Sequence, residues 1–449
     1  MAEDEAVDGV ETQAKPERRA LFALAAAGVA LVALAPIGLY FLFEPSFESF
    51  VAVALAQGAV YAAAVYIVVR RRVGRGALAI VFIAAVVARV IALPAPALLS
   101  TDVARYVWDG RVQAAGINPY RYVPADPQLA DLRDTAIYPH INRADYAVTI
   151  YPPVAEIMFF LATRVSESVT MMRLTMIGFE AVTVLALLAL LDHDGRPAAR
   201  VLIYAWHPLP IWEFAGTGHV DAAAIALMTF ATLAVVRERR VLVGIALAAG
   251  TLIKPFVLLV APPLWRRWDW RLPAAFVVTA VLCYLPYLSV GSGVLGYLGG
   301  GYQDEQGYLD GKGFFLVALL RRLGLPAPSG LAFAIFAVVV LAAVALAITF
   351  RAKPREADPA VFLPLPAAAV LLVSPHYAWY FAFLLPLLVR APYAPLVYVT
   401  LVSFILYLPP IMNFDDFFTA GLWLYGGFAL LAVADFAVRA RPLPIRSPA

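Results

Sequence analysis

Polar side chains recur on one face of a helix predicted to begin near Ser100. At about 100° per residue, that face carries Asp102, Arg105, Tyr106, Asp109 and Gln113. A carboxylate can take a proton from a hydroxyl group, while arginine and aromatic side chains bind anions and sugar rings, so the pattern predicts a sugar-handling surface. A solvated helix face, with Asp102 as its N-cap after Thr101, explains the same pattern. The spacing alone leaves both interpretations open.

A second group of ionisable residues lies in the segment 206–222, near the outer end of two predicted spans. Its members are His207, Glu213, His219 and Asp221. Charged groups at membrane depth are costly, which makes them functional candidates. Because His219 and Asp221 flank a predicted break between helices, capping by Asp221 is the structural alternative. The histidines lack the close ligand spacing of a zinc site and no cysteine pair accompanies them, so no cofactor is predicted and a divalent metal ion is not favoured.

Lys254 is one of only four lysines in the chain and lies between two apolar segments. A cation at a helix break near the membrane surface needs an anion, and a lipid-linked phosphate supplies one. A lysine that snorkels to interfacial water is the alternative. Later in the chain, the segment 374–380 contains four rings that could stack on a sugar or form an interfacial aromatic belt, namely His376, Tyr377, Trp379 and Tyr380.

These residues must be positioned by helices that cross a membrane. Of the 449 residues 63% are hydrophobic and 14% are charged, which excludes soluble enzymes, disulfide-linked scaffolds and disordered proteins. The apolar runs lack the period-two alternation of barrel strands, so outer-membrane barrels are excluded as well. The pattern predicts an all-α polytopic membrane protein with about 14 transmembrane helices. A net charge of +3, scattered among loops, does not indicate nucleic-acid binding.

The chain is predicted to form one transmembrane catalytic domain over residues 20–438. The polar residues 1–19 predict a disordered cytoplasmic tail, and residues 439–449 predict a second cytoplasmic tail. Two loops are expected to face outward. Residues 94–152 hold the amphipathic helix, which is expected to lie on the membrane surface. The second is the flexible, glycine-rich stretch 291–313. Within it the segment 299–313, which contains Asp304, Glu305 and Asp310, is either a gate for an acceptor or a solvated connector.

Basic residues on one side of the predicted spans orient the chain by the positive-inside rule. They form five clusters: Arg18 with Arg19; Arg70, Arg71, Arg72 and Arg75; Arg237, Arg239 and Arg240; Arg351, Lys353 and Arg355; and Arg439 with Arg441. This orientation places both termini in the cytoplasm and the segments that hold Asp102 and His219 outside. The run 241–265 has basic residues at both ends, which predicts two short helices hinged at Lys254 and Pro255 instead of one crossing.

Together these segments resemble the GT-C superfamily of polytopic glycosyltransferases, and within it the bacterial polyprenol-phosphate-mannose-dependent mannosyltransferases. The resemblance rests on four patterns: D-x-x-R-Y-x-W-D-G with G-x-N-P-Y over 102–120, HP…GxGHxDA over 207–222, LIKP at 252–255, and the late HYAWY…LPLL run. It implies a GT-C fold and an inverting transferase. It also implies a multi-pass protein of the bacterial plasma (inner) membrane whose active site faces the periplasm or the cell exterior.

In that superfamily an acidic residue of the first outward loop acts as the base, and the resemblance implies this role for Asp102, with Asp109 as second choice. Lys254 would hold the donor phosphate, and His219 and Asp221 would line the sugar pocket. The other implied substrate contacts are Arg105, Tyr106, Asp109, Asn118, Tyr120, His376, Tyr377 and Tyr380. Asp102 has no adjacent second acid, which favours a base that acts without a metal ion.

The implied partners are a polyprenyl-phosphate sugar donor, a glycan, lipid or protein acceptor, and membrane lipids. A nucleotide-sugar donor would require a cytosolic site, and the sequence has no glycine-rich phosphate loop for one. A transporter or flippase of a lipid-linked glycan is the main alternative. It would need polar residues along both halves of a pathway, whereas the intramembrane charges concentrate outward apart from Glu180. A scaffold in envelope assembly is a third interpretation.

Overall fold

The computed structural model describes residues 2–71, 73–74, 76–299, 301–351, 358–408 and 414–439. Over these residues the chain forms helices joined by loops and contains no strand, which confirms the all-α prediction. Several members of the basic clusters lie outside the described residues, namely Arg72, Arg75, Lys353, Arg355 and Arg441. Nearly all of the predicted C-terminal tail lies outside them as well.

Within the described residues, six helical segments are long and apolar enough to cross a membrane, and a bent pair adds a seventh if it forms one span. They are Glu17–Phe43 within α1 (Ala2–Phe43), α2 (Phe47–Arg70), α6 (Val169–His193), Arg271–Glu305, Gly330–Phe350 within α14 (Gly330–Arg351), and Phe417–Val438. Arg271–Glu305 contains α11 (Arg271–Tyr284), the 3-10 helix η6 (Leu285–Gly299) and α12 (Gly301–Glu305). Phe417–Val438 joins α18 (Phe414–Gly421), the π-helix η10 (Leu422–Gly426) and α19 (Gly427–Arg439). The chain is therefore a polytopic membrane protein.

Other apolar helices have 10–17 residues. They are α3 (Ala77–Ala92), α9 (Arg240–Thr251), η5 (Pro255–Val260) with α10 (Ala261–Leu264), η7 (Pro359–Phe362) with α15 (Pro364–Val373), η8 (Ala378–Leu384) with α16 (Leu385–Arg390), and α17 (Ala394–Val402) with η9 (Ser403–Tyr407). α13 (Phe315–Arg322) is shorter still. At about 1.5 Å per residue such helices cover roughly 15–25 Å, less than the ~30 Å hydrocarbon core. The predicted total of about 14 crossings is not confirmed, because breaks at proline and glycine shorten many apolar runs.

The stretch from residue 198 to residue 236 does not form one straight helix. η3 (Ala198–Val201) and α7 (Leu202–Ala205) lead into the π-helix η4 (Pro210–Gly216), and α8 (Asp221–Val236) is bent from η4 by 119°. Gly218, at the turn, has a φ of +81°, and a Cβ there would lie 3.1 Å from Val103. Glycine alone adopts this backbone conformation without strain, so it permits the reversal that brings the start of α8 close to α4.

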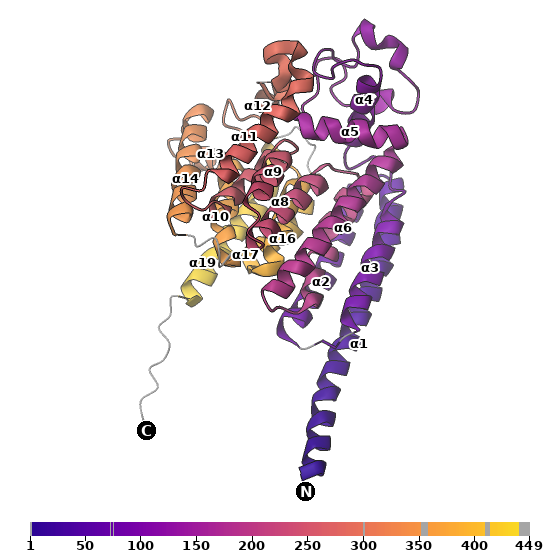
Figure 1. Cartoon of the computed structure of the whole chain (residues 1–449), viewed down its shortest axis with the longest axis vertical. Helices are drawn as coiled ribbons and strands as arrows, with labels where there is room; N and C mark the ends of the chain where they lie inside the picture. The colour runs from indigo at the N-terminus through magenta and orange to yellow at the C-terminus, as the bar shows by residue number, and fades with distance from the viewer. Residues whose placement is uncertain are drawn as a thin grey trace.

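Short helices from two distant segments of the chain gather at one end of the molecule. α4 (Asp102–Ala114), α5 (Pro153–Val165) and α12 lie at the top of Figure 1, while α1 begins and α19 ends toward the bottom. η1 (Pro127–Leu132) and η2 (Tyr138–His140) follow α4. The helix predicted near Ser100 is confirmed, but its polar face is not solvated, since residues 103–110 are all buried. α5, α6, η1 and η2 pack against α4, so α4 is a core helix of this part of the chain.

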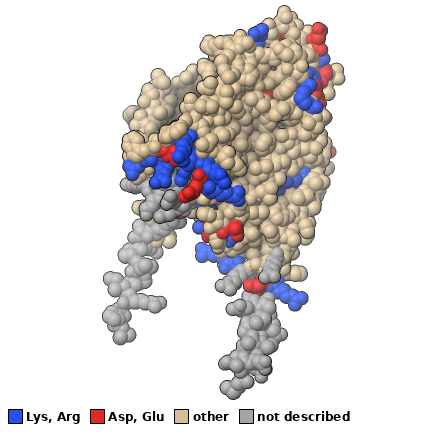
Figure 2. All heavy atoms as spheres, in the orientation of Figure 1, with Lys and Arg blue, Asp and Glu red and all other residues tan. Residues whose placement is uncertain are grey.

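The outer surface of the long helices is apolar. Leu430, Phe436 and Val338 are 75%, 74% and 66% exposed, respectively. On the face seen in Figure 2, uncharged atoms cover most of the surface between the charged groups near the top and those along the lower left and the bottom. Exposure of so much apolar surface to water is costly, whereas lipid chains cover it without that cost. The surface therefore agrees with a position in the membrane.

A buried ion pair joins α3 to α6 inside the bundle. Arg89 Nε donates to both carboxylate oxygens of Glu180 at 3.1 Å, and Arg89 Nη1 donates to the carbonyl of Ala205 at 2.9 Å. Glu180 thus has a charged partner. It is the carboxylate that the sequence predicts within the membrane, apart from the charges predicted to face outward. The pair fastens α3, α6 and α7 together, which is a structural role.

Candidate functional site

Three segments that are far apart in the sequence meet at the end of the bundle where α4 lies. Asp102 begins α4, His219 and Asp221 lie at the bend before α8, and Lys254 lies between α9 and η5. The Asp102 carboxylate is close enough to interact electrostatically with His219 and Asp221. Lys254 Nζ lies 3.6 Å from Asp221 Oδ2. The structure therefore brings together four of the ionisable residues that the sequence identifies as candidates.

Asp102 is the first residue of α4 and does not cap the helix. Thr101 occupies the N-cap position without a side-chain hydrogen bond, and Ser100 Oγ accepts from the Asp102 N–H at 3.2 Å. Asn142 Nδ2 donates to Asp102 Oδ1 at 2.6 Å, and no described residue donates to Oδ2. A carboxylate that is held at one oxygen and open at the other can take a proton from a bound hydroxyl group.

His219 and Asp221 are almost fully buried, and no described residue forms a hydrogen bond with either ring nitrogen of His219 or either side-chain oxygen of Asp221. Lys254 Nζ lies 3.6 Å from Asp221 Oδ2, and Glu213 Oε2 lies 3.6 Å from His219 Nε2. Val220, not Asp221, occupies the N-cap position of α8, so Asp221 is not the capping residue. Buried polar groups without hydrogen bonds are destabilising, and a polar ligand bound here would satisfy them.

Lys254 lies at the predicted hinge. It takes an extended conformation with a φ of −144°, and Pro255 then begins η5. Lys254 Nζ lies 4.9 Å from the ring centre of Tyr380 and 5.9 Å from that of Tyr151. The side chain is only 14% exposed, and Asp221 is its charged partner within the described chain. The ammonium group is held inside the site by aromatic faces and a carboxylate, so it does not snorkel to the interface.

Aromatic rings of the 374–380 segment line one side of the site. Trp379 stacks on His219 with ring centres 4.0 Å apart, and Tyr377 stacks on Trp379 at 4.5 Å. The Tyr380 hydroxyl lies 2.7 Å from the hydroxyl of Tyr302 in α12. Flat ring faces of this kind suit the apolar C–H faces of a sugar, so these rings can orient a sugar as well as pack against one another.

Arg105 and Asp109 pair with each other. Arg105 Nε donates to Asp109 Oδ1 at 2.8 Å, Arg105 Nη1 donates to the Ala147 carbonyl at 3.1 Å, and both side chains are buried. Glu156 lies beside them and accepts a hydrogen bond from Thr149 Oγ1 at 2.6 Å. Burial, and then the charge of Asp109, raises the pKa of Glu156 well above its usual range. This cluster joins α4 to α5, and its geometry favours a structural role for Arg105 and Asp109.

Three other residues that were predicted to contact the substrate form hydrogen bonds between loops. Asn118 Nδ2 donates to the Tyr287 carbonyl at 2.9 Å, the Tyr120 hydroxyl donates to the Tyr151 carbonyl at 2.6 Å, and His376 Nε2 lies 2.8 Å from the Gly313 carbonyl oxygen. These contacts tie the turn after α4 and the loop after α12 to their neighbours. Tyr106 differs, because its buried hydroxyl has no hydrogen-bond partner in the described chain and lies within electrostatic range of Asp102.

Two residues at the site could not be identified from the sequence. Asn142 lies in an irregular stretch between η2 and α5, where no periodicity or motif marks it. Tyr302 belongs to α12, a helix within the stretch that the sequence presents only as a flexible glycine-rich loop.

The site is made of charged and polar side chains from three segments. Among the described residues, no group of three or more His, Cys, Asp or Glu side chains could hold a metal ion. The site combines a carboxylate at the start of α4, a cation at the break after α9, and buried polar groups at the start of α8. This arrangement can activate a hydroxyl nucleophile and stabilise an anionic leaving group.

Residues 149–375, just over half of the chain, match glycosyltransferase family 87. The matched region includes His219, Asp221 and Lys254, and it begins after Asp102 and Asn142. No curated protein and no solved structure matches the chain.

Proposed function

The chain belongs to glycosyltransferase family 87, a GT-C-type family of membrane glycosyltransferases, and from this we propose that it moves a sugar from a polyprenyl-phosphate donor to an outward-facing acceptor. The proposed sugar is mannose, and the proposed acceptor is a glycan, a lipid or a protein. The observation that carries the proposal is the convergence of a carboxylate, Asp102, and a cation, Lys254, around the unsatisfied polar groups of His219 and Asp221.

In the proposed reaction Asp102 takes the proton of the acceptor hydroxyl while the hydroxyl oxygen attacks the anomeric carbon. The bond between that carbon and the phosphate oxygen breaks, and the electron pair leaves with the polyprenyl phosphate. Attack opposite the leaving phosphate inverts the anomeric centre. The leaving phosphate carries one negative charge more than the donor phosphodiester, and the ammonium group of Lys254 stabilises this developing charge.

The sugar is proposed to lie between the start of α8 and the aromatic run. His219 and Asp221 offer polar atoms that lack hydrogen bonds in the described chain, and these atoms can bind sugar hydroxyls. Trp379 and Tyr377 offer stacked ring faces. Since Lys254 supplies the positive charge that a divalent ion would otherwise supply at the phosphate, we propose that transfer is independent of metal ions.

We place the protein in the bacterial plasma membrane with both termini in the cytoplasm and the site facing the periplasm or the cell exterior. The site lies at the end of the molecule that is opposite to the start of α1 and the end of α19 (Figure 1). Glu180 was the main sequence feature in favour of a transporter or flippase, and its pairing with Arg89 gives this carboxylate a structural role.

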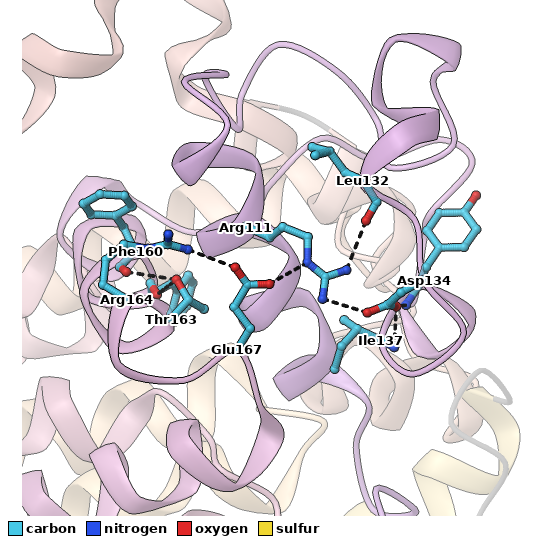
Figure 3. A network of polar contacts seen from close by, with 10 residues as sticks. Arg111, Leu132, Asp134, Ile137, Phe160, Thr163, Arg164 and Glu167 are labelled. Carbon is cyan, nitrogen blue, oxygen red and sulfur yellow. Dashed lines mark hydrogen bonds and ion pairs between the residues drawn. The ribbon is translucent and has the colours of Figure 1, made fainter.

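The proposal is tested with purified protein in lipid vesicles, supplied with radiolabelled polyprenyl-phosphate mannose and a membrane glycan and lipid extract. Asp102→Asn and Lys254→Ala are expected to lower transfer by about 10²- to 10⁴-fold. Glu167→Gln is the matched acid-to-amide control, since Glu167 pairs with Arg111 and Arg164 (Figure 3), which do not belong to the candidate site. Transfer by both site variants at the wild-type rate, or movement of labelled lipid without a transferred product, contradicts the proposal.

A further inference from the structure

Two neighbouring residues of the outer loop hold different parts of the site. Asn142 binds the Asp102 carboxylate, and the next residue, Arg143, binds the carboxylate of Glu305 in α12. Arg143 Nε donates to the two Glu305 oxygens at 2.9 and 2.8 Å, and Arg143 Nη2 donates to Oε1 as well. Arg143 has a φ of +57°, an unfavourable conformation for a residue with a side chain, so the contacts of this dipeptide help to hold it.

α12 also contacts the aromatic side of the site. The hydroxyl groups of Tyr302 and Tyr380 lie 2.7 Å apart, and Gln306, the residue after α12, donates from Nε2 to the Tyr377 hydroxyl at 3.2 Å. Tyr380 in turn lies beneath the ammonium group of Lys254. α12 therefore connects the loop that holds the candidate base with the rings beside the candidate phosphate ligand.

The position of α12 depends on these side chains more than on its own helix. It has five residues, too few to be stable alone. Gly307 and Gly311, which follow it, have φ values of +66° and +80°. The side chains of Arg143 and Glu305 are 21% and 10% exposed, so their attraction is only partly screened by water and salt. Loss of this pair is expected to release α12 from the outer loop.

We propose that the Arg143–Glu305 pair is a latch through which closure of α12 positions the candidate base. When the latch is closed, the backbone at 142–143 is held and Asn142 fixes the orientation of Asp102. When it is open, Asn142 loses this support and the Asp102 carboxylate rotates away from its working position. Asn142, Arg143 and Glu305 are therefore positioning residues. The inference rests on the proposed function, and it adds that the acceptor is activated only after α12 covers the site.

Steady-state kinetics separate this role from a purely structural one. Asn142→Ala and Glu305→Gln are each expected to lower kcat by about 10- to 100-fold, because a misplaced base slows the chemical step, and to change the KM for polyprenyl-phosphate mannose by less than about threefold. The double variant is expected to be no slower than the slower single variant, since both act through the same carboxylate. Losses that multiply in the double variant contradict the latch.

Exchange of the two charges tests the contact itself. Arg143→Glu and Glu305→Arg are each expected to lower kcat, and the variant that combines them is expected to recover most of it, because the ion pair is restored in reverse. The control is Glu167→Gln, which removes an ion-pairing carboxylate of the same kind (Figure 3) outside the candidate site and is expected to leave kcat unchanged. No recovery in the combined variant counts against the latch.

Hydrogen exchange provides a readout that requires no turnover. In Glu305→Gln the amides of residues 140–147 are expected to exchange faster than in the wild type and in Glu167→Gln. Unchanged exchange in this segment overturns the latch.

Different results would overturn the proposed function and the latch. Transfer by both Asp102→Asn and Lys254→Ala at the wild-type rate overturns the proposed function, whereas an inactive Asp102→Asn together with fully active Asn142→Ala and Glu305→Gln overturns the latch alone.

Discussion

Lys254 Nζ lies 3.6 Å from Asp221 Oδ2, and this ion pair joins the break after α9 to the start of α8. The Asp221 side chain is fully buried and that of Lys254 is 14% exposed, so each charge compensates the other in the ligand-free protein. A phosphate bound to Lys254 would compete with this carboxylate and leave Asp221 available to a sugar hydroxyl. The pair thus links donor binding to the sugar pocket.

Removal of Lys254 alone is expected to affect both stability and activity. Lys254→Ala leaves the Asp221 carboxylate buried without its counter-charge, which is expected to lower the free energy of unfolding by about 3 kcal/mol. Lys254→Ala combined with Asp221→Asn is expected to recover most of the stability but none of the transfer. Thermal unfolding in detergent and the transfer assay measure the two effects. A double variant as unstable as the single variant would show that the ion pair is not what supports Asp221.

Trp379 is expected to contribute to donor binding. Trp379→Ala removes the ring that stacks on His219 and is expected to raise the KM for the donor by about 10-fold, whereas Trp379→Phe keeps most of the stacking. Trp270→Ala is the control, because Trp270 is 72% exposed and lies outside the site. An unchanged KM in Trp379→Ala would remove this ring from the proposed sugar pocket.

Glu156→Gln is expected to be tolerated, because burial and the charge of Asp109 raise the pKa of Glu156 well above its usual range. Such a carboxyl contributes stability below its unfolded-state pKa of about 4.3, and this contribution is lost as the pH rises toward the folded-state pKa. Glutamine imitates the protonated form without that loss. Thermal unfolding between about pH 5 and pH 9 is therefore expected to show Glu156→Gln gaining stability relative to the wild type as the pH rises. Equal pH dependence of the two proteins contradicts this expectation.

Gly296 is expected to be indispensable for the approach of η6 to the outer loop. Its φ is +58°, and a Cβ would lie 2.2 Å from the Thr149 carbonyl oxygen, which accepts a hydrogen bond from the N–H of Tyr297 at 3.0 Å. Gly296→Ala is expected to lower the free energy of unfolding by about 2 kcal/mol and to reduce transfer, since α12 follows directly. Gly293→Ala is the matched control, because its Cβ would lie 3.6 Å from the nearest side chain. Equal melting temperatures for the two variants would contradict the prediction.

Local patterns were sufficient for much of the architecture. The start of α4 near Asp102 and the hinge at Lys254 were both predicted, because helix breaks and polar ends depend on residues within one or two turns. Local patterns were not sufficient for the number of crossings, since an apolar run does not reveal where packing bends it. The i, i+4 spacing of Arg105 and Asp109 permitted an ion pair as well as a shared binding face, and the structure shows the pair.

By itself the sequence determined that this chain is a helical membrane protein with few charges, because hydrophobicity and helix breaks are properties of short segments. It also indicated which charges lie outside. Only the tertiary structure decided which of them meet. Asp102 is held by Asn142, a residue 40 positions away, and Arg143 reaches Glu305, 162 positions away. Such contacts arise when distant segments pack together, and no local pattern encodes them.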